Sequence, residues 1–216
     1  SRGCYILAQA KLLKSAGYDI KIINPLPLIP PFYSYFNKNF TGFKYIEKVR
    51  NIENIDVFHP RYFCFPGTML PKLSQNNAKV ILSKIYNWLE NWKPDIVHLH
   101  SIHPLLKIGK IISKKYNSKF FMTIHGWDFD IGIKKEKIRQ SILEITSEID
   151  GMCVVNESHL KIATKFIGNK KTSYIPCHFD IEENEKREIE EFDLSLKKLK
   201  LLFPANPSRI EKNYSL

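Results

Sequence analysis

Histidine side chains gather just behind two apolar stretches in the middle of the chain. His98 and His100 alternate at the end of the first stretch and His103 follows it, while His125 comes directly after the second. His125 also opens the tetrapeptide His125–Asp128, which combines imidazole, glycine and carboxylate groups. Imidazole and carboxylate groups hydrogen-bond hydroxyls, and glycine allows a ligand to approach the backbone. The pattern predicts a polar site that suits a sugar or a nucleotide.

The same histidines allow a metal site as an alternative. Alternate residues of a strand point to one face, so His98 and His100 form a pair of the kind that metallo-hydrolases use. A metal-dependent hydrolase using His98, His100 and His103 is therefore one interpretation. No carboxylate lies within this run, and Asp95 stands at the other end of the stretch. Histidines that are packed and hydrogen-bonded at the end of a sheet are the favoured interpretation.

Further candidate binding residues lie at the starts of helices and after strands. Gly3 precedes the first helical pattern, where free backbone N–H groups can bind phosphate. Asn156 follows an apolar strand pattern. Arg209 and Lys212 follow another, where a guanidinium and an ammonium group together would neutralise a diphosphate without a metal ion.

These residues need a scaffold, and the periodicity of the chain predicts one. Apolar strand patterns alternate with amphipathic helix patterns, which is typical of right-handed βαβ crossovers and a parallel sheet. The fold class predicted is α/β, a Rossmann-like doubly wound parallel sheet, in which ligands bind beyond the carboxyl ends of the strands. The strands expected are 19–23, 57–65, 95–100, 119–124, 151–155 and 172–175, and the helices expected are 6–15, 80–92, 105–116, 136–147 and 157–166. The proline-rich stretch Pro25–Pro31 is expected to be irregular.

Composition narrows the class of protein. The chain has 216 residues with 33 Lys and Arg against 22 Asp and Glu, a formal net charge of +11. The Lys residues are spread over the helix patterns and no recognition helix is evident, so no nucleic-acid partner is expected. A non-catalytic basic binding module remains an alternative. The 4 cysteines show no zinc-binding or disulfide spacing, and no apolar run reaches the length of a membrane span, so a cytoplasmic protein is expected.

Six segments in order along the chain resemble the sugar-nucleotide glycosyltransferases of family four, which have the two-domain GT-B architecture. The segments are Gly3, Gly17–Pro25, Lys93–His100, Thr123–Asp128, Asp150–Asn156 and Phe203–Asn213. The last segment is particularly similar to bacterial transferases of cell-surface polysaccharide biosynthesis. The resemblance implies transfer of a hexosyl-type sugar, with retention, from a nucleotide-diphosphate donor to a hydroxyl of a saccharide or lipid-linked acceptor.

The resemblance also implies roles for individual residues. His125 would be catalytic, stabilising the positive charge of the transferred sugar through a hydrogen bond or through its backbone carbonyl. Arg209 and Lys212 would hold the leaving diphosphate, which the loop at Gly3 would face. Asp128 and Asn156 would contribute to substrate binding. No cofactor and no divalent metal ion are expected.

The resemblance divides the chain into an acceptor-side domain at 1–176, a linker with a surface helix at 177–199, and the start of a donor-binding domain at 200–216. The opening strand of the family is absent before Ser1, and its place is between the strands at Ile20 and Val97. We therefore expect the 216 residues alone to be inactive and poorly stable, because the edges of two strands are left unpaired.

An aromatic segment, Phe32–Phe36, is followed by a basic one, Lys38–Lys48. Basic surfaces are attracted to anionic membranes, where lipid-linked acceptors lie. The pair of segments is a hypothetical membrane-facing loop, which would place the protein at the inner face of the membrane as a peripheral protein.

Overall fold

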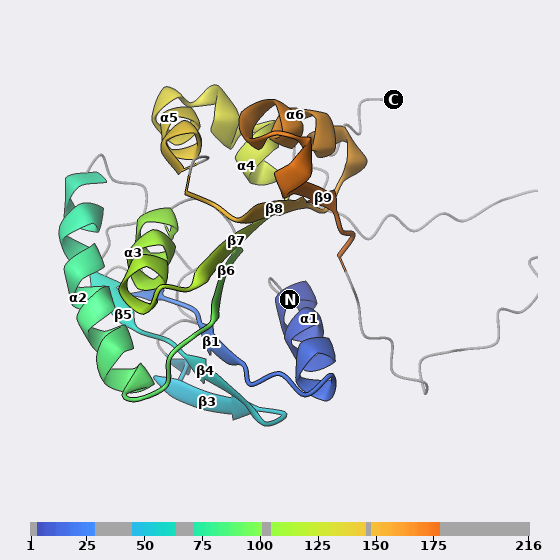
Figure 1. Ribbon diagram of the computed structural model, residues 1–216. Coiled ribbons are helices and arrows are strands. Elements are labelled where there is room, and N and C mark those ends of the chain that lie inside the picture. Colours follow the sequence, from blue (N-terminus) through green and yellow to red (C-terminus); the bar gives the residue numbers. More distant parts are fainter. Residues whose placement is uncertain (1–3, 29–44, 64–70, 101–104, 146–147, 178–216) are drawn as a thin grey trace, which may run out of the picture. The chain divides into compact units, whose positions relative to one another are not determined.

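The computed structural model describes residues 4–28, 45–63, 71–100, 105–145 and 148–177 (Figure 1). All of them belong to one compact unit, Ser1–Phe179, and a second unit comprises Asp180–Leu216. The helices described are α1 (Cys4–Ser15), α2 (Pro71–Leu89), α3 (Leu106–Tyr116), α4 (Trp127–Asp130), α5 (Glu136–Ile145) and α6 (Glu157–Ile167), with short 3-10 turns at Gly132–Lys134 and Asn169–Lys171. The strands described are β1 (Lys21–Ile23), β2 (Leu26–Leu28), β3 (Val49–Ile52), β4 (Ile55–Phe58), β5 (Arg61–Phe63), β6 (Ile96–His100), β7 (Lys119–Ile124), β8 (Gly151–Val154) and β9 (Thr172–Tyr174).

The later half of the unit is a parallel sheet with the strand order β6-β7-β8-β9. It confirms the predicted α/β class, and all four strands begin within one residue of the expected positions. One face of this sheet packs against α3, α4, α5 and α6 through a buried apolar cluster. The cluster comprises Leu99, Leu106, Phe120, Met122, Ile124, Phe129, Ile142, Ile149, Met152, Val154 and Ala163.

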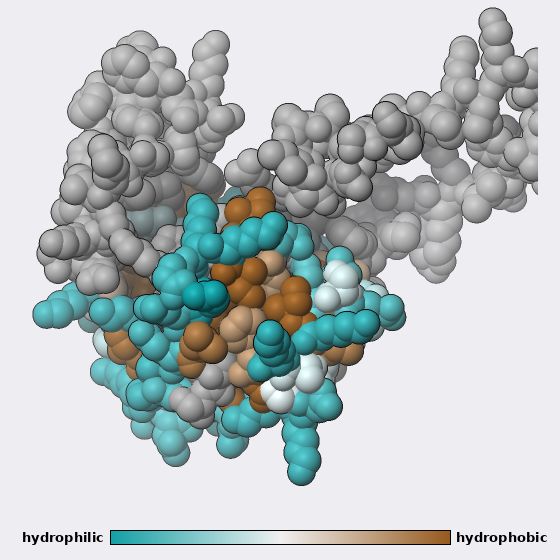
Figure 2. Space-filling view, turned by 90° about the horizontal axis from the view of Figure 1, so that it is seen from above, coloured by the Kyte–Doolittle hydropathy of each residue, from teal (hydrophilic) through white to brown (hydrophobic). Residues whose placement is uncertain are grey.

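The two faces of this sheet differ in chemistry. Because side chains alternate along a strand, the residues between the apolar ones point to the opposite face of the sheet. They include His98 and His100 on β6, Thr123 on β7 and Cys153 on β8. The helices of the first face carry the outer surface seen in Figure 2, where hydrophilic residues surround a smaller area of hydrophobic ones. The apolar face thus holds the sheet in place, and the second face is left for polar side chains.

The earlier half of the unit differs from the prediction in several ways. Its strands form two small groups, β1-β4-β3 and β2-β5. The expected strand at 57–65 is interrupted at His59 and Pro60, between β4 and β5. The stretch expected to be irregular contains β2, which pairs in parallel with β5 although Pro27 lies within it. Proline is tolerated there because β2 has a neighbour on one side only among the described strands.

The hairpin β3–β4 was not expected from the sequence. Its turn consists of Glu53 and Asn54, whose φ angles of 52° and 64° are both positive. Two successive positive φ angles match the twist of antiparallel strands, but here they occur without the glycine that usually signals such a turn. The side chain of Asn51 stabilises the turn by accepting a hydrogen bond from the Asn54 backbone N–H at 3.1 Å.

No described strand pairs with β1 on the side away from β4, or with β6 on the side away from β7. A cavity of about 140 Å³ lies between these two edges, lined by Ile23 of β1, by Val97 and Leu99 of β6, and by apolar residues of α2 and α3. Helix α1 begins next to His125, since the rings of Tyr5 and His125 lie 4.5 Å apart.

The unpaired edges lead to a prediction for amide hydrogen exchange. Alternate N–H groups of β6 face the cavity and should exchange far faster than those of β7, which has neighbours on both sides. Exchange followed residue by residue by NMR spectroscopy in the 216-residue chain tests this. Strand β7 serves as the internal reference. Uniform protection along β6 would show that its edge is paired, and the prediction would then be wrong.

Candidate active site

The pairing of β6 with β7 brings the predicted histidines together. His100 is in register with Thr123, so His125, two residues further on, reaches the same face beyond the end of β7. The Nδ1 atom of His100 lies 2.9 Å from Nε2 of His125, and Nε2 of His98 lies 2.8 Å from Oγ1 of Thr123. Both contacts are hydrogen bonds that run diagonally across the two strands. We call His98, His100, Thr123 and His125 the histidine cluster.

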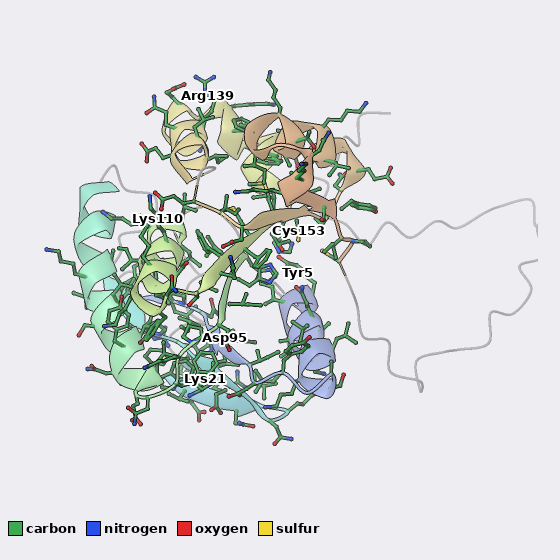
Figure 3. All side chains as sticks on the ribbon, viewed as in Figure 1. Tyr5, Lys21, Asp95, Lys110, Arg139 and Cys153 are labelled. Atoms are coloured by element: carbon green, nitrogen blue, oxygen red, sulfur yellow. The ribbon has the colours of Figure 1, made fainter. Side chains whose placement is uncertain are left out.

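Ring contacts extend the histidine cluster and cover it. The rings of His98 and His100 are 4.4 Å apart, and those of His100 and His125 are 5.2 Å apart. The ring of Tyr5, which Figure 3 labels at the N-terminal end of α1, lies 4.5 Å from the ring of His125. The Sγ atom of Cys177, beyond β9, lies 3.8 Å from Nδ1 of His125. Protein groups therefore contact both ring nitrogens of His125.

Burial determines the charge of the histidine cluster. Loss of hydration lowers the pKa of His100 to about 3, with smaller contributions from the neighbouring His98 and His125. Burial likewise lowers the pKa of His125 to about 4, aided by His98, and lowers the pKa of His98. All three imidazoles are therefore neutral near pH 7, and each can donate one hydrogen bond and accept another.

The hydrolase interpretation finds no ligand set in the described part of the chain. No group of three His, Cys, Asp or Glu side chains among those residues is arranged to hold a metal ion. Instead, His98 bonds to a hydroxyl and His100 bonds directly to His125. His103, the third ligand of that interpretation, lies outside the described residues.

The backbone turn after His125 is supported by a hydrogen bond between Asp130 and the buried His159 that the sequence did not reveal. Gly126 has a φ of +101°, and its carbonyl oxygen accepts hydrogen bonds from Phe129 and Asp130, each at 2.9 Å. The Asp130 carboxylate in turn lies 2.7 Å from Nε2 of His159, which is 3% exposed. A local sequence pattern could not indicate this pair, because Asp130 and His159 meet only when α4 packs against α6.

Of the other predicted site residues, only Asn156 has a side chain in the described part of the structure. Asn156 caps helix α6, its side-chain oxygen accepting a hydrogen bond from the Ser158 backbone N–H at 2.9 Å. Asp128 lies in α4, and its side chain is outside the described part. The remaining candidates, Gly3, Arg209 and Lys212, also lie outside it, as do Phe32–Phe36 and most of Lys38–Lys48.

Comparison with known proteins decides the family. The family model for Glycosyltransferase Family 4 matches residues 5–183, which include all the described strands and the histidine cluster. The chain belongs to glycosyltransferase family 4. The resemblance found in the sequence is thereby confirmed, and the protein is a glycosyltransferase. No curated protein matches it significantly.

A solved structure supports the fold of this glycosyltransferase. The chain is similar to a sucrose-phosphate synthase from Thermosynechococcus elongatus, with a TM-score of 0.54 and 13% sequence identity. The match covers 81% of this chain and 84% of the other. At this level of identity the similarity concerns the fold, and it confirms the Rossmann-like GT-B class. Among the described helices, none has the length and apolar character that crossing a membrane requires.

The turn at Gly126 leads to a prediction about stability. A Cβ atom at Gly126 would lie 3.3 Å from Oδ2 of Asp130, in addition to the strain of a positive φ. Gly17 has a similar φ of +91° but nothing within 4 Å, so Gly17→Ala measures the backbone strain alone. We expect Gly17→Ala to lower the free energy of unfolding by about 1 kcal/mol and Gly126→Ala by about 2–3 kcal/mol. Equal losses in urea titrations would contradict the role assigned to Asp130.

The neutral histidines lead to a prediction about pH. The unfolded chain binds protons at these residues below about pH 6.5, whereas the folded chain stays neutral until the pKa values of about 4 and about 3. Their contribution to stability is therefore complete above about pH 6.5 and is lost as the pH falls, by at most about 1.4 kcal/mol per pH unit for each histidine.

Urea unfolding between about pH 7 and about pH 5 measures this slope. The His100→Asn variant should have a shallower slope, because one proton-binding group is removed, whatever its effect on the absolute stability. His98 and His59, whose pKa values are also lowered, contribute in the same direction in both proteins. An unchanged slope in His100→Asn would mean that His100 is not held neutral by folding.

Proposed function

We propose that this glycosyltransferase moves a sugar from a nucleotide-diphosphate donor to a hydroxyl acceptor with retention of configuration, and that the described unit is its acceptor-side domain. The observation that carries the proposal is the histidine cluster at the carboxyl ends of β6 and β7, in a chain of this family. Ligands of open parallel sheets bind at that edge. Neutral imidazoles suit uncharged sugar hydroxyls, which need both donors and acceptors.

The backbone of His125 is the group best suited to the reacting sugar. Both ring nitrogens of His125 contact protein groups, whereas no described residue donates a hydrogen bond to its carbonyl oxygen. A carbonyl oxygen held in a fixed turn stabilises positive charge that develops at the anomeric carbon in the transition state. The Gly126 turn and the Asp130–His159 pair fix the direction of this carbonyl.

The diphosphate is assigned to residues outside the described part. Arg209 and Lys212 would neutralise the charge of the leaving group, and the backbone at Gly3 would face the phosphates, so that no divalent metal ion is required. Asp128 would bind sugar hydroxyls. The side-chain oxygen of Asn156 already caps α6, so the amide nitrogen of this residue is the atom left to contact a substrate.

The acceptor proposed is a saccharide or a lipid-linked saccharide, as in the synthesis of cell-surface polysaccharides. The net charge of +11 favours a peripheral, cytoplasmic position on an anionic membrane. A vesicle sedimentation assay tests this part: binding that does not depend on anionic lipid would contradict it.

A transfer assay with nucleotide-diphosphate sugars tests the central proposal. We expect sugar transfer, with retained anomeric configuration, from the natural protein that carries this chain together with a donor-binding domain, and none from the 216 residues alone. Replacing Gly126 by Ala should lower kcat by about 100-fold, because the carbonyl of His125 is displaced. Gly17→Ala, which has similar backbone strain away from the site, is the matched control and should retain kcat. Inversion of configuration, or activity that is unaffected by Gly126→Ala, would refute this mechanism.

A further inference from the structure

Two hydrogen bonds link Cys177, His125 and His100 into a chain that ends at His100. The first joins Sγ of Cys177 to Nδ1 of His125 at 3.8 Å, and the second joins Nε2 of His125 to Nδ1 of His100 at 2.9 Å. In a neutral imidazole one nitrogen carries the proton and the other accepts. Fixing the proton at one end of the chain therefore fixes it at every position.

We propose that His125 acts through its side chain as a positioning residue, and that Nε2–H of His100 is the hydrogen-bond donor that the histidine cluster offers to a substrate oxygen. This inference rests on the proposed function, which it deepens by naming the atom that binds. The proposal specifies the tautomers of both histidines: His125 carries its proton on Nε2, and His100 also carries its proton on Nε2.

The direction of the chain follows from the chemistry of the thiol. Sulfur is a weak acceptor, whereas an imidazole nitrogen is a good one, so the Cys177 thiol donates to Nδ1 of His125. His125 must then carry its proton on Nε2 and donate it to Nδ1 of His100. Since burial keeps His100 neutral, its single proton lies on Nε2.

No described residue occupies the end of this hydrogen-bonded chain. No described residue lies within hydrogen-bonding distance of Nε2 of His100, and this atom is not among the enclosed unpartnered atoms of the described part, where only Nδ1 of His159 is found. His98 uses its Nε2 for the hydrogen bond to Thr123. His100 is also the last residue of β6, at the edge where ligands of parallel sheets bind.

Other groups around these three residues do not reverse the direction of the hydrogen bonds. Tyr5 contacts the face of the His125 ring, and His98 contacts the face of the His100 ring. Face contacts leave the in-plane nitrogens unchanged as donors and acceptors. Among the described residues, no Asp, Glu, Lys or Arg side chain forms a hydrogen bond with either ring or shifts its pKa.

NMR spectroscopy of the 216-residue chain with ¹⁵N-labelled histidine tests the proton positions directly. Near pH 7, His100 and His125 should both show the Nε2–H form. The Cys177→Ser variant keeps a donor and should leave both forms unchanged, whereas Cys177→Ala should produce mixed forms at His125. A proton on Nδ1 of His100 in the unaltered chain would overturn the proposal.

Kinetics of the complete enzyme test the donor role. His100→Asn keeps an acceptor near the position of Nδ1 but lacks the outer N–H, so kcat/KM should fall by between about twofold and tenfold, the effect of one hydrogen bond. His100→Gln places an amide N–H near the outer position and should recover part of the loss. His59→Asn, at a buried histidine between β4 and β5, is the control for general effects on packing and should not change kcat/KM.

The two proposals fail in different ways. Absence of sugar transfer by the complete enzyme would refute the proposed function and would leave the NMR result standing as a property of the fold. Transfer that is unaffected by His100→Asn would refute the donor role of His100 and would leave the proposed function intact.

Discussion

The parallel pairing of β6 with β7 is the constraint on which the rest of the structure depends. Its register sets Leu99 beside Met122 and His100 beside Thr123, so one alternation of residues builds an apolar core and the other builds a polar face. A slip of one residue would exchange the two faces and bury the histidines among the helices. Burial of the apolar face therefore determines where the polar groups lie, although those groups point to the other face.

The polar face has an energetic consequence. Three imidazoles lie close together, and protonating any of them is unfavourable because hydration is lost and a neighbouring imidazole repels the charge. The hydrogen bonds to Thr123 and between His100 and His125 compensate for the lost hydration of the neutral rings. The fold is therefore less stable in acid, and in return its histidine side chains have defined hydrogen-bond donors and acceptors.

The sequence was most informative where one physical effect dominated. Strand β7 was predicted with its observed bounds, because an apolar run lies between the polar residues that surround it. Strand β2 was missed because prolines normally exclude a strand, an argument that does not hold at a sheet edge. The histidines were found as candidates, but their partners were not. His100 and His125 are 25 residues apart, and only the register of two strands determines which nitrogen meets which.

The unpaired edges of β1 and β6 have a consequence for how the unit can change over evolution. The histidine cluster belongs wholly to β6, β7 and the turn that follows, whereas β1 to β5 form separate groups of strands. Among the described strands, these groups share no ladder of hydrogen bonds with the sheet β6-β7-β8-β9, and side chains of α2 and α3 join them to it. Substitutions in the first half therefore reach the histidines only through side-chain packing, as at Tyr5 of α1 and in the apolar cluster around α2 and α3.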